Sequence, residues 1–532
     1  MNKIFSLLLF SCLFSSCGIF LQKTGVKNYS PKEKISQKGL NDYQYDFLYL
    51  NQLLEEGFPQ LDSIFPKNER QKQAEHTLSA LANTDNNTDF VMQTRKYLSN
   101  LKNQHTNIAL NQEFKQVFPY VIHISSNSWY LLNVSKQYDS LQIGKKIVEI
   151  NGLATEEIER RLIEYTFAEN KINQQFQVRD LQLYNKPQYL VQIGLIKEKT
   201  EPLRLIFEDH SAIELLPISI ENGIDVYDIV LKENPITKYQ NKTYWYAIHQ
   251  KEKFGYLQFN RCHDKIDIID GIESYVKPWL QPIARAYVKR QFKKEKPSKQ
   301  IANFYNPQYP IFKDFLWEFI DSLNTHQVEN LIIDLRNNPG GNLTLGIQLM
   351  YFLTEKENLK GFQEYAFTSE VYKKYFRKNY QELEKKYPEG VPQKTLVLNN
   401  EEQNLFSEIT NENSKYFIQR NRPIFKGNVY ILSNYKTGSA AAMLTTLLQD
   451  NGIGTTIGTS VGNNPIGATT YTPMELPKTK AKISIATTYK ERPDKTKGKI
   501  QIPDIWVEYT MEDLMSGKDP YLEIVVEKIK KE

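Results

Sequence analysis

The sequence is poor in cysteine, and the little it has is unevenly placed. Only three cysteines occur among 532 residues, and two of them, Cys12 and Cys17, lie in the first seventeen positions. Three cysteines cannot build a disulfide scaffold or a zinc site made of thiolates. No cluster of other side chains has the spacing of metal ligands, so the sequence predicts neither a metal ion nor an organic cofactor.

An excess of charge of one sign is also lacking. The 67 lysines and arginines against 62 aspartates and glutamates leave a net charge of +5. Spread over 532 residues, this positive charge is too small to predict a nucleic-acid-binding surface, which needs a local basic stripe. Aromatic residues, by contrast, are plentiful, with 33 tyrosines and 27 phenylalanines. They can build sizeable cores, which excludes global disorder, and the length predicts three or four domains.

The first sixteen residues have the pattern of an export signal. Lys3 supplies a positive start, and the apolar stretch 4–14 is shorter than the roughly 20 residues of a membrane-spanning helix. The Ser-Ser-Cys-Gly of residues 15–18 resembles the lipidation site of bacterial lipoproteins, in which Cys17 becomes the lipid-bearing N-terminus. The alternative is an ordinary secretory signal with an incidental cysteine. We expect a lipid-anchored protein of the cell envelope that faces the periplasm.

The patterns along the chain divide it into five parts. Apolar positions near a 3.6-residue period predict helices between Tyr43 and Leu101, and strand-like runs dominate 114–233, including one at Tyr189–Ile196. Strands alternate with helices in the remainder, which predicts an α/β fold. The expected parts are a signal peptide at 1–16, a tether at 17–42, a helical region at 43–110, a β-rich domain at 111–233 and an α/β domain at 234–532.

Part of the β-rich domain resembles a PDZ domain. Residues 139–152 contain a turn glycine, an Ile-Val-x-Ile strand and an Asn-Gly turn before a helical pattern, as the central part of a PDZ domain does. The resemblance implies that 111–233 is a PDZ-like domain with additional strands, which would bind peptide chains by adding a strand to a sheet edge. The alternative is an unrelated hairpin, because Asn-Gly is a common two-residue turn.

Two turns of the α/β part carry candidate catalytic groups. Residues 330–341 join a buried-strand pattern to a sharp turn, where Gly340 permits positive φ and can present a backbone N–H to a ligand. Residues 429–444 read as a strand, a Thr-Gly turn and an Ala/Leu-rich helix that opens with Ser439. A hydroxyl there lies near the positive end of the helix dipole, beside the N–H of Ala440. This is the strand–turn–helix arrangement of a nucleophilic serine, although a helix N-cap is the commoner role of such a serine taken alone.

A base for this serine is expected at His105. A serine hydroxyl is a weak nucleophile at neutral pH and needs a base, most often histidine. His105 follows a helical pattern and precedes an apolar strand, whereas the other six histidines lie in no such setting.

Together these segments resemble the family of serine peptidases that includes the tail-specific (C-terminal-processing) proteases and the tricorn core. The matching segments are Gln104-His105-Thr106, the PDZ-like part, Leu-Arg-Asn-Asn-Pro-Gly-Gly at 335–341, Thr-Gly-Ser-Ala at 437–440, Ile-Pro-Asp-Ile at 502–505 and Asp-Pro-Tyr-Leu-Glu at 519–523. The resemblance implies a ClpP/crotonase-like α/β domain and a serine endopeptidase. It also implies that Ser439 is the nucleophile, that His105 is the base, and that Gly340 and Ala440 supply the oxyanion hole.

Several positions depart from the family pattern. The tail-specific branch has a lysine base at a position that corresponds to Asn464, so a Ser–Lys dyad is not expected. The segment 458–465 around this position is closer to the tricorn-type branch, whose base is histidine. That branch also has a serine before the histidine and a glutamate before Pro-Asp, and the family often has an acid three residues after the nucleophile. The corresponding residues here are Gln104, Lys497 and Ala442. Glu491 or Asp494 is then the candidate orienting acid.

The motifs and the altered positions together leave two alternative functions. The first is an exported, lipid-anchored serine endopeptidase that cleaves peptides or unfolded proteins held by the PDZ-like part. The second is a catalytically decayed member of the same fold that acts as a peptide- or ligand-binding lipoprotein, motivated by the altered positions. Cys262 follows a predicted strand and is expected to be a buried neutral thiol.

Overall fold

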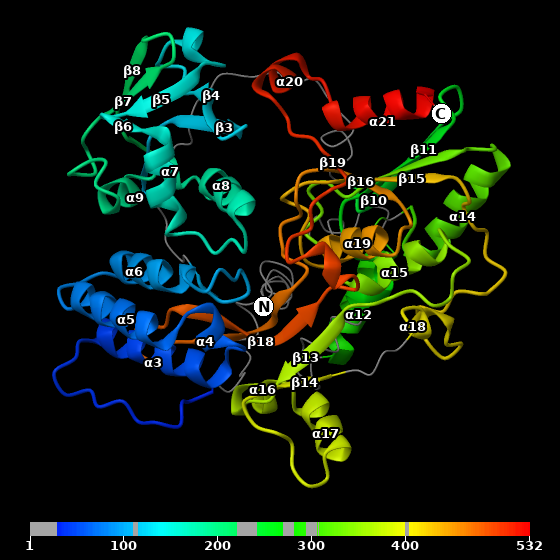
Figure 1. The fold of residues 1–532 in the computed structure, drawn as a ribbon, viewed down its shortest axis with the longest axis horizontal. Helices are drawn as coiled ribbons and strands as arrows, with labels where there is room; N and C mark the ends of the chain where they lie inside the picture. The colour runs from blue at the N-terminus through cyan, green and yellow to red at the C-terminus, as the bar shows by residue number, and fades with distance from the viewer. Residues whose placement is uncertain are drawn as a thin grey trace.

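The computed structural model describes residues 29–109, 115–220, 242–269, 281–293, 306, 308–399 and 404–531. The predicted export signal and Cys17 lie outside these residues. The described chain folds into an N-terminal helical region, a middle region built on one larger sheet, and a C-terminal region with two sheets (Figure 1). The mixed α/β fold with a helical N-terminal region is therefore confirmed. Within the described ranges, no helix is both long enough and apolar enough to cross a bilayer.

The N-terminal region consists of helices packed on a C-terminal strand. The helices are α3 (Asp42–Gly57), α4 (Leu61–Ile64), α5 (Lys67–Leu81) and α6 (Asn87–Ser99). Helix α3 begins where Asn41 and Gln44 form a reciprocal capping box. Apolar side chains of these helices share one core with Ile483 and Ile485 of the distant strand β18 (Lys482–Glu491). The helical region is thereby attached to the sheet that carries β18.

The middle region contains a sheet with the strand order β3-β4-β5-β7-β8, to which β6 is added beside β5. Its elements are β3 (Tyr120–Ser125), β4 (Ser128–Val134), η1 (Ser140–Gln142), β5 (Lys146–Ile150), β6 (Leu153–Ala154), α7 (Thr155–Ile163), α8 (Lys171–Asp180), η2 (Leu183–Asn185), α9 (Pro187–Gln192), β7 (Leu203–Phe207) and β8 (Ala212–Leu215). The short strands β2 (Gln116–Val117) and β9 (Ile218–Ser219) pair with each other.

The strand expected at Tyr189–Ile196 is wrong, because this segment begins with helix α9. Pro187 occupies the first turn of the helix, where its missing N–H leaves no hydrogen bond unmade. Tyr189 and Leu190 are buried in the core of the middle region. A short apolar run of this kind fits a buried helix as well as a strand, so its periodicity alone could not decide.

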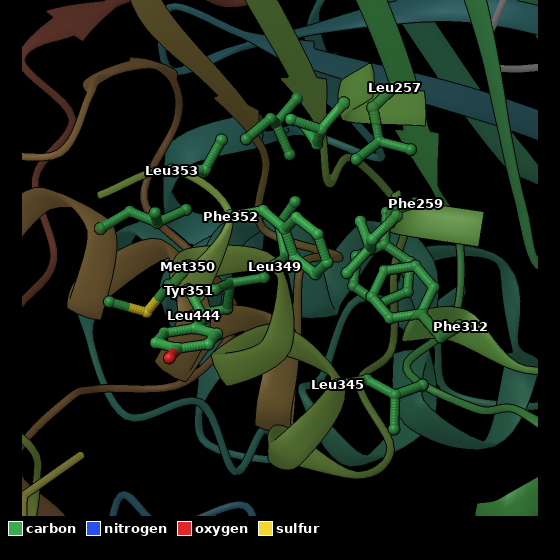
Figure 2. Close-up of a cluster of buried hydrophobic side chains, with 14 of the residues drawn as sticks. Leu257, Phe259, Phe312, Leu345, Leu349, Met350, Tyr351, Phe352, Leu353 and Leu444 are labelled. Carbon is green, nitrogen blue, oxygen red and sulfur yellow. The ribbon is translucent and has the colours of Figure 1, made fainter. Parts of the chain in front are cut away.

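The larger C-terminal sheet has the order β10-β11-β12-β15-β16-β19, and from β11 onward every pair is parallel. Its strands are β10 (Tyr244–His249), β11 (Phe254–Phe259), β12 (Asn330–Asp334), β15 (Asn428–Ser433), β16 (Thr455–Gly458) and β19 (Ile505–Trp506). Successive side chains on a strand point to opposite faces. Leu331 and Ile333 therefore join the core beneath helices α14 (Phe312–Thr325), α15 (Leu343–Tyr351) and α19 (Ser439–Asp450). Figure 2 shows part of this core.

The opposite face of this sheet is covered by the C-terminal helix α21 (Pro520–Lys531). Ile332 and Tyr430 point to this face and share a second apolar core with Tyr521 and Val525 of the helix. The sheet is thus the middle layer of a three-layer α/β/α unit, and all its strands except the edge strand β10 are parallel. In such units ligands bind beyond the carboxyl ends of the strands, which here include the loops after β12 and β15.

A second C-terminal sheet reaches the N-terminal region. It has the order β1-β18-β13-β14, with β17 also paired to β18; the other bounds are β1 (Asn107–Ile108), β13 (Gln363–Phe367), β14 (Leu396–Leu398) and β17 (Gly467–Glu475). Asn107 of β1 lies opposite Ser484 of β18. The chain just after the N-terminal helices is therefore fixed to the C-terminal region. The remaining elements are α12 (Gln281–Phe292), α16 (Glu370–Tyr375), α17 (Arg377–Lys386), α18 (Ser407–Thr410), η4 (Lys495–Lys497) and α20 (Met511–Ser516).

Candidate active site

Ser439 lies where strand β15 turns sharply into helix α19. It is the first residue of the helix and has a φ of 48°, a left-handed conformation that is strained for a residue with a side chain. Thr437 anchors the turn, because its hydroxyl donates to the Leu335 carbonyl (2.9 Å) and its own carbonyl accepts from the Gly462 N–H (2.8 Å). The neighbouring loops thus hold the strained serine in place.

The two N–H groups at the start of α19 differ in their partners. The Ser439 N–H donates to Asn463 Oδ1 at 2.7 Å. The Ala440 N–H takes part in no hydrogen bond among the described residues. It lies in the first helical turn, where N–H groups have no partner within the helix and the helix dipole favours negative charge. Ala440 can therefore donate to an oxyanion that forms at Ser439.

The loop after β12 packs directly against the serine turn. Gly340 has a φ of 98°, and a Cβ placed on it would lie 2.7 Å from the Ala440 nitrogen and from Ser439 Cβ. Only glycine fits there. The Gly340 N–H donates to Asn338 Oδ1 at 2.8 Å. The oxyanion-hole role predicted for Gly340 therefore requires that this bond be exchanged for one to the substrate.

A buried ion network fixes the base of this loop. Arg336 is fully buried and forms ion pairs with Asp334 (2.6 Å) and Asp519 (2.7 Å). It also donates to the Tyr509 hydroxyl and lies over the ring of Tyr521. The arginine of the sequence motif therefore connects the Gly340 loop to the C-terminal segment, and it does not project toward a substrate.

His105 lies between the N-terminal helices and strand β18, held by its neighbours. The Gln104 side chain donates to the Gly462 carbonyl (2.5 Å), and Thr106 Oγ1 accepts from the Ala486 N–H (2.9 Å). The His105 carbonyl accepts from the Ser484 hydroxyl at 2.9 Å. Burial, assisted by the charge of Lys490, lowers the pKa of the His105 imidazole to about 4. The imidazole is consequently neutral at physiological pH and able to accept a proton.

Glu169, in the segment between α7 and α8, was not found by sequence reasoning. Its Oε1 lies 3.8 Å from His105 Nδ1, and its side chain is only 8% exposed. Its Oε2 accepts from the Asn464 N–H at 2.6 Å. Burial raises the pKa of this carboxyl to about 6, although Lys490 and the hydrogen bonds oppose that rise. No local pattern marks Glu169, because it meets the site only through the tertiary fold.

The segment 461–464 joins these groups into one cluster. Asn463 accepts from the Ser439 N–H at 2.7 Å, and its side chain is close enough to Glu169 to lower the pKa of that carboxyl. The neighbouring Asn464 bonds Glu169 through its backbone and, through its Oδ1, accepts from the Asn170 side chain at 2.8 Å. Ser439, Glu169 and His105 therefore belong to one contiguous site, and Asn464 occupies a structural place in it.

The candidate acids from the end of the chain are not brought to His105. Glu491 accepts from the Tyr365 hydroxyl (2.9 Å) and pairs with Lys495 (2.6 Å). The side chain of its neighbour Lys490 is buried near His105. Because successive side chains of a strand point to opposite faces, the side chain of Glu491 points away from His105. Asp494 is occupied with the backbone and hydroxyl of Thr496.

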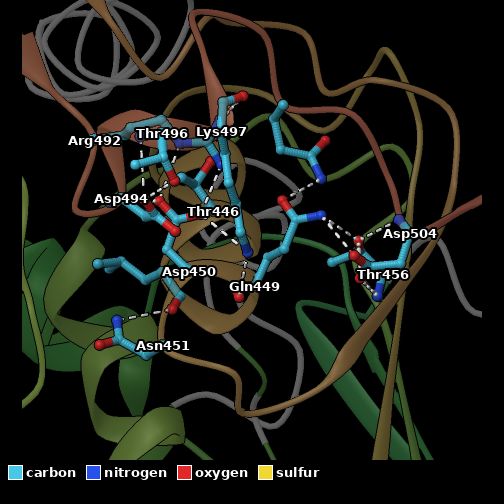
Figure 3. Close-up of polar contacts among 12 residues, drawn as sticks. Thr446, Gln449, Asp450, Asn451, Thr456, Arg492, Asp494, Thr496, Lys497 and Asp504 are labelled. Carbon is cyan, nitrogen blue, oxygen red and sulfur yellow. Dashed lines mark hydrogen bonds and ion pairs between the residues drawn. The ribbon is translucent and has the colours of Figure 1, made fainter.

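The remaining altered positions lie within helix α19 or at its far end. Ala442 is buried in the helix. Lys497 donates to the Gln449 carbonyl (3.0 Å) and lies 3.7 Å from Asp450, next to the buried ion pair of Asp450 with Arg492 (Figure 3). With a rise of about 1.5 Å per residue, that end of the helix is roughly 16 Å from Ser439. Lys497 therefore stabilises the helix end and does not reach the serine.

A second histidine also lies beside the glycine loop. His263 Nδ1 contacts Asp267 Oδ2, and a Cβ placed on Gly341 would lie 2.8 Å from His263 Nε2. The adjacent Cys262 is fully buried, and burial raises the pKa of its thiol to about 12, as expected for a neutral thiol. In the described part of the chain, no group of three or more potential metal ligands lies together.

Comparisons with known proteins show what part of this chain is similar to. Residues 300–507 match the family model described as peptidase family S41; this segment contains Ser439 and Gly340. No curated protein sequence matches the chain. Two solved structures that are similar are mature CPAF complexed with lactacystin, with a TM-score of 0.57, and a CPAF mutant, with a TM-score of 0.59. Each is 13% identical, and each alignment covers 92% of this chain and 97% of the other. The shared fold therefore extends through all three regions.

Proposed function

The chain contains a serine-type peptidase domain of family S41, and on that premise we propose that it is an exported, lipid-anchored serine endopeptidase acting on peptides or unfolded proteins. The observation that carries the proposal is the strained Ser439 at the start of α19, with the Gly340 loop packed against it. A nucleophilic serine on a sharp strand-to-helix turn presents its hydroxyl next to N–H groups that bind the developing oxyanion.

In the proposed reaction, the Ser439 hydroxyl attacks the scissile carbonyl while the neutral His105 accepts the hydroxyl proton. The Ala440 N–H stabilises the oxyanion, joined by the Gly340 N–H once that group leaves Asn338. The protonated His105 then donates its proton to the leaving amine. Burial keeps His105 deprotonated over the physiological range, so its imidazole is free to accept the hydroxyl proton at the start of the cycle.

The middle region is the proposed holder of the substrate chain. Strand β3 lies at one end of its sheet, and no other strand of the described residues pairs with the outer edge of β3. A cavity of about 590 Å³ lies beside this edge, and Ile122, Phe176 and Tyr435 are among the residues that line it. An extended peptide added to β3 would therefore lie close to the serine turn.

Hydrolysis of casein and of short fluorogenic peptides tests the proposal. The wild type should cleave these substrates, and Ser439→Ala should abolish cleavage without lowering the melting temperature. Ser407→Ala, an exposed serine on α18, is the matched control and should remain active. The anchor is tested separately, because incorporation of radiolabelled palmitate should be lost in Cys17→Ser.

The second candidate is a binding lipoprotein with a decayed site. Two observations favour it. The Gly340 N–H, which would bind the oxyanion, already donates to Asn338. The 3.8 Å between His105 Nδ1 and Glu169 Oε1 is also too long for a hydrogen bond that would orient the base. This function predicts peptide binding that Ser439→Ala leaves unchanged, together with no turnover of any substrate.

A further inference from the structure

The buried carboxylate of Glu169 faces a histidine nitrogen that has no partner. His105 Nδ1 is buried without a hydrogen bond, and Glu169 Oε1, at 3.8 Å, is an anionic acceptor. A hydrogen bond between these atoms needs a separation of about 2.7–3.2 Å, so a small approach of the two side chains would form it. The pairing would give the imidazole the orientation and tautomer that a serine peptidase requires.

The surroundings of Glu169 fix which of its oxygens faces His105. The Asn464 N–H donates to Oε2 at 2.6 Å, which leaves Oε1 toward the imidazole. Lys490 is also buried in this cluster, and its charge favours the ionised form of Glu169. Burial still leaves the pKa of Glu169 raised to about 6, so the carboxylate is ionised above that pH, and its orientation is defined by a backbone donor.

Glu169 lies just before helix α8, which docks on the loops around Ser439. Asn173 donates to the carbonyls of Val461 (2.8 Å) and Gly462 (3.1 Å). The ring of Phe176 stacks on that of Tyr435, with centroids 4.0 Å apart. The middle region thus contributes a charged group to a site whose nucleophile lies in the C-terminal region.

Resting on the proposed function, we propose that Glu169 is the positioning residue of His105, supplied by the middle region in place of the acids that the end of the chain lacks. It holds the imidazole with its proton on Nδ1, so that Nε2 can accept the proton of Ser439. The C-terminal candidates Glu491 and Asp494 are bonded elsewhere, which leaves Glu169 as the acid that the described structure places at His105.

Glu169→Gln is the most informative variant because the Asn464 N–H should keep its hydrogen bond, now to the oxygen of the new side-chain amide. The amide NH₂ then faces His105 Nδ1, which must become an acceptor and transfer its proton to Nε2. With the wrong tautomer, kcat should fall by about 10⁴, as happens when a triad acid becomes an amide, with little change in KM. Glu169→Asp should restore part of the lost kcat, and Glu491→Gln, the matched control, should behave as the wild type.

The tautomer itself is measured by ¹⁵N chemical shifts of labelled histidine, well above the pKa of Glu169, with the His105 signals assigned by His105→Ala. We expect the Nδ1–H form in the wild type and the Nε2–H form in Glu169→Gln. An unchanged tautomer, or a kcat equal to that of Glu491→Gln, would overturn the proposal. This measurement does not depend on turnover. A wild type that hydrolyses nothing but shows the tautomer change would therefore refute the proposed function and leave the role of Glu169 intact.

Discussion

Replacing Gly340 by alanine tests whether the glycine loop and Ser439 form one catalytic unit. The added Cβ would lie 2.7 Å from the Ala440 nitrogen, the Gly438 carbonyl oxygen and Ser439 Cβ. Two of these three atoms belong to the backbone, so no side-chain rotation can relieve the contact. Since ordinary contact begins at 3.4 Å, the serine turn must move by about 0.7 Å, and displacements of about 1 Å can cost 10²-fold in rate.

The assay compares two alanine variants with the same kind of backbone strain. Gly390 also has a positive φ, 122°, but a Cβ there would meet nothing within 4 Å. Both variants should lose about 1–2 kcal/mol of stability from the left-handed conformation. Only Gly340→Ala should also lose roughly 10²-fold in kcat for a fluorogenic peptide. Peptide hydrolysis by Gly340→Ala at the rate of Gly390→Ala would refute the assignment of this loop to the active site.

Three further predictions concern the charges around the site. Lys490→Met removes a charge that lowers the pKa of both His105 and Glu169, so both pKa values should rise. The acid limb of the pH profile of kcat/KM should then move to higher pH. An unmoved limb would show that Lys490 does not act on these two groups. His105→Ala should abolish hydrolysis, whereas His263→Ala should retain it; the reverse result would identify His263 as the base. Arg336→Met removes the ion-pair partner of two buried carboxylates, Asp334 and Asp519. The free energy of unfolding, measured by urea titration, should fall by about 3–5 kcal/mol. A loss of no more than about 1 kcal/mol, the value typical of exposed ion pairs, would contradict this prediction.

Local patterns in the sequence predicted much of the fold. The strand at Asn330–Asp334 and the helix that begins at Ser439 occur where apolar runs and turn residues indicate them. The error at Tyr189–Ile196 arose because a short apolar run does not distinguish a buried helix from a strand, and Pro187 was the signal that could have decided it. Such patterns work because each depends on residues close together in the chain.

The site is harder to predict because its contacts are distant in sequence. The bond between Glu169 and Asn464 joins residues 295 positions apart. The family motifs predict an acid near the end of the chain, but the candidate there, Glu491, is paired with Lys495. The roles of Ser439 and His105 stay predictions until activity is measured.

Covalent labelling of the native protein by a fluorophosphonate probe tests the central claim most directly. The account predicts one adduct, mapped by peptide mass spectrometry to Ser439 and absent from Ser439→Ala. It also predicts much slower labelling of His105→Ala, because the base is then missing. A folded wild type that takes up no probe, or an adduct on another serine, would contradict the account.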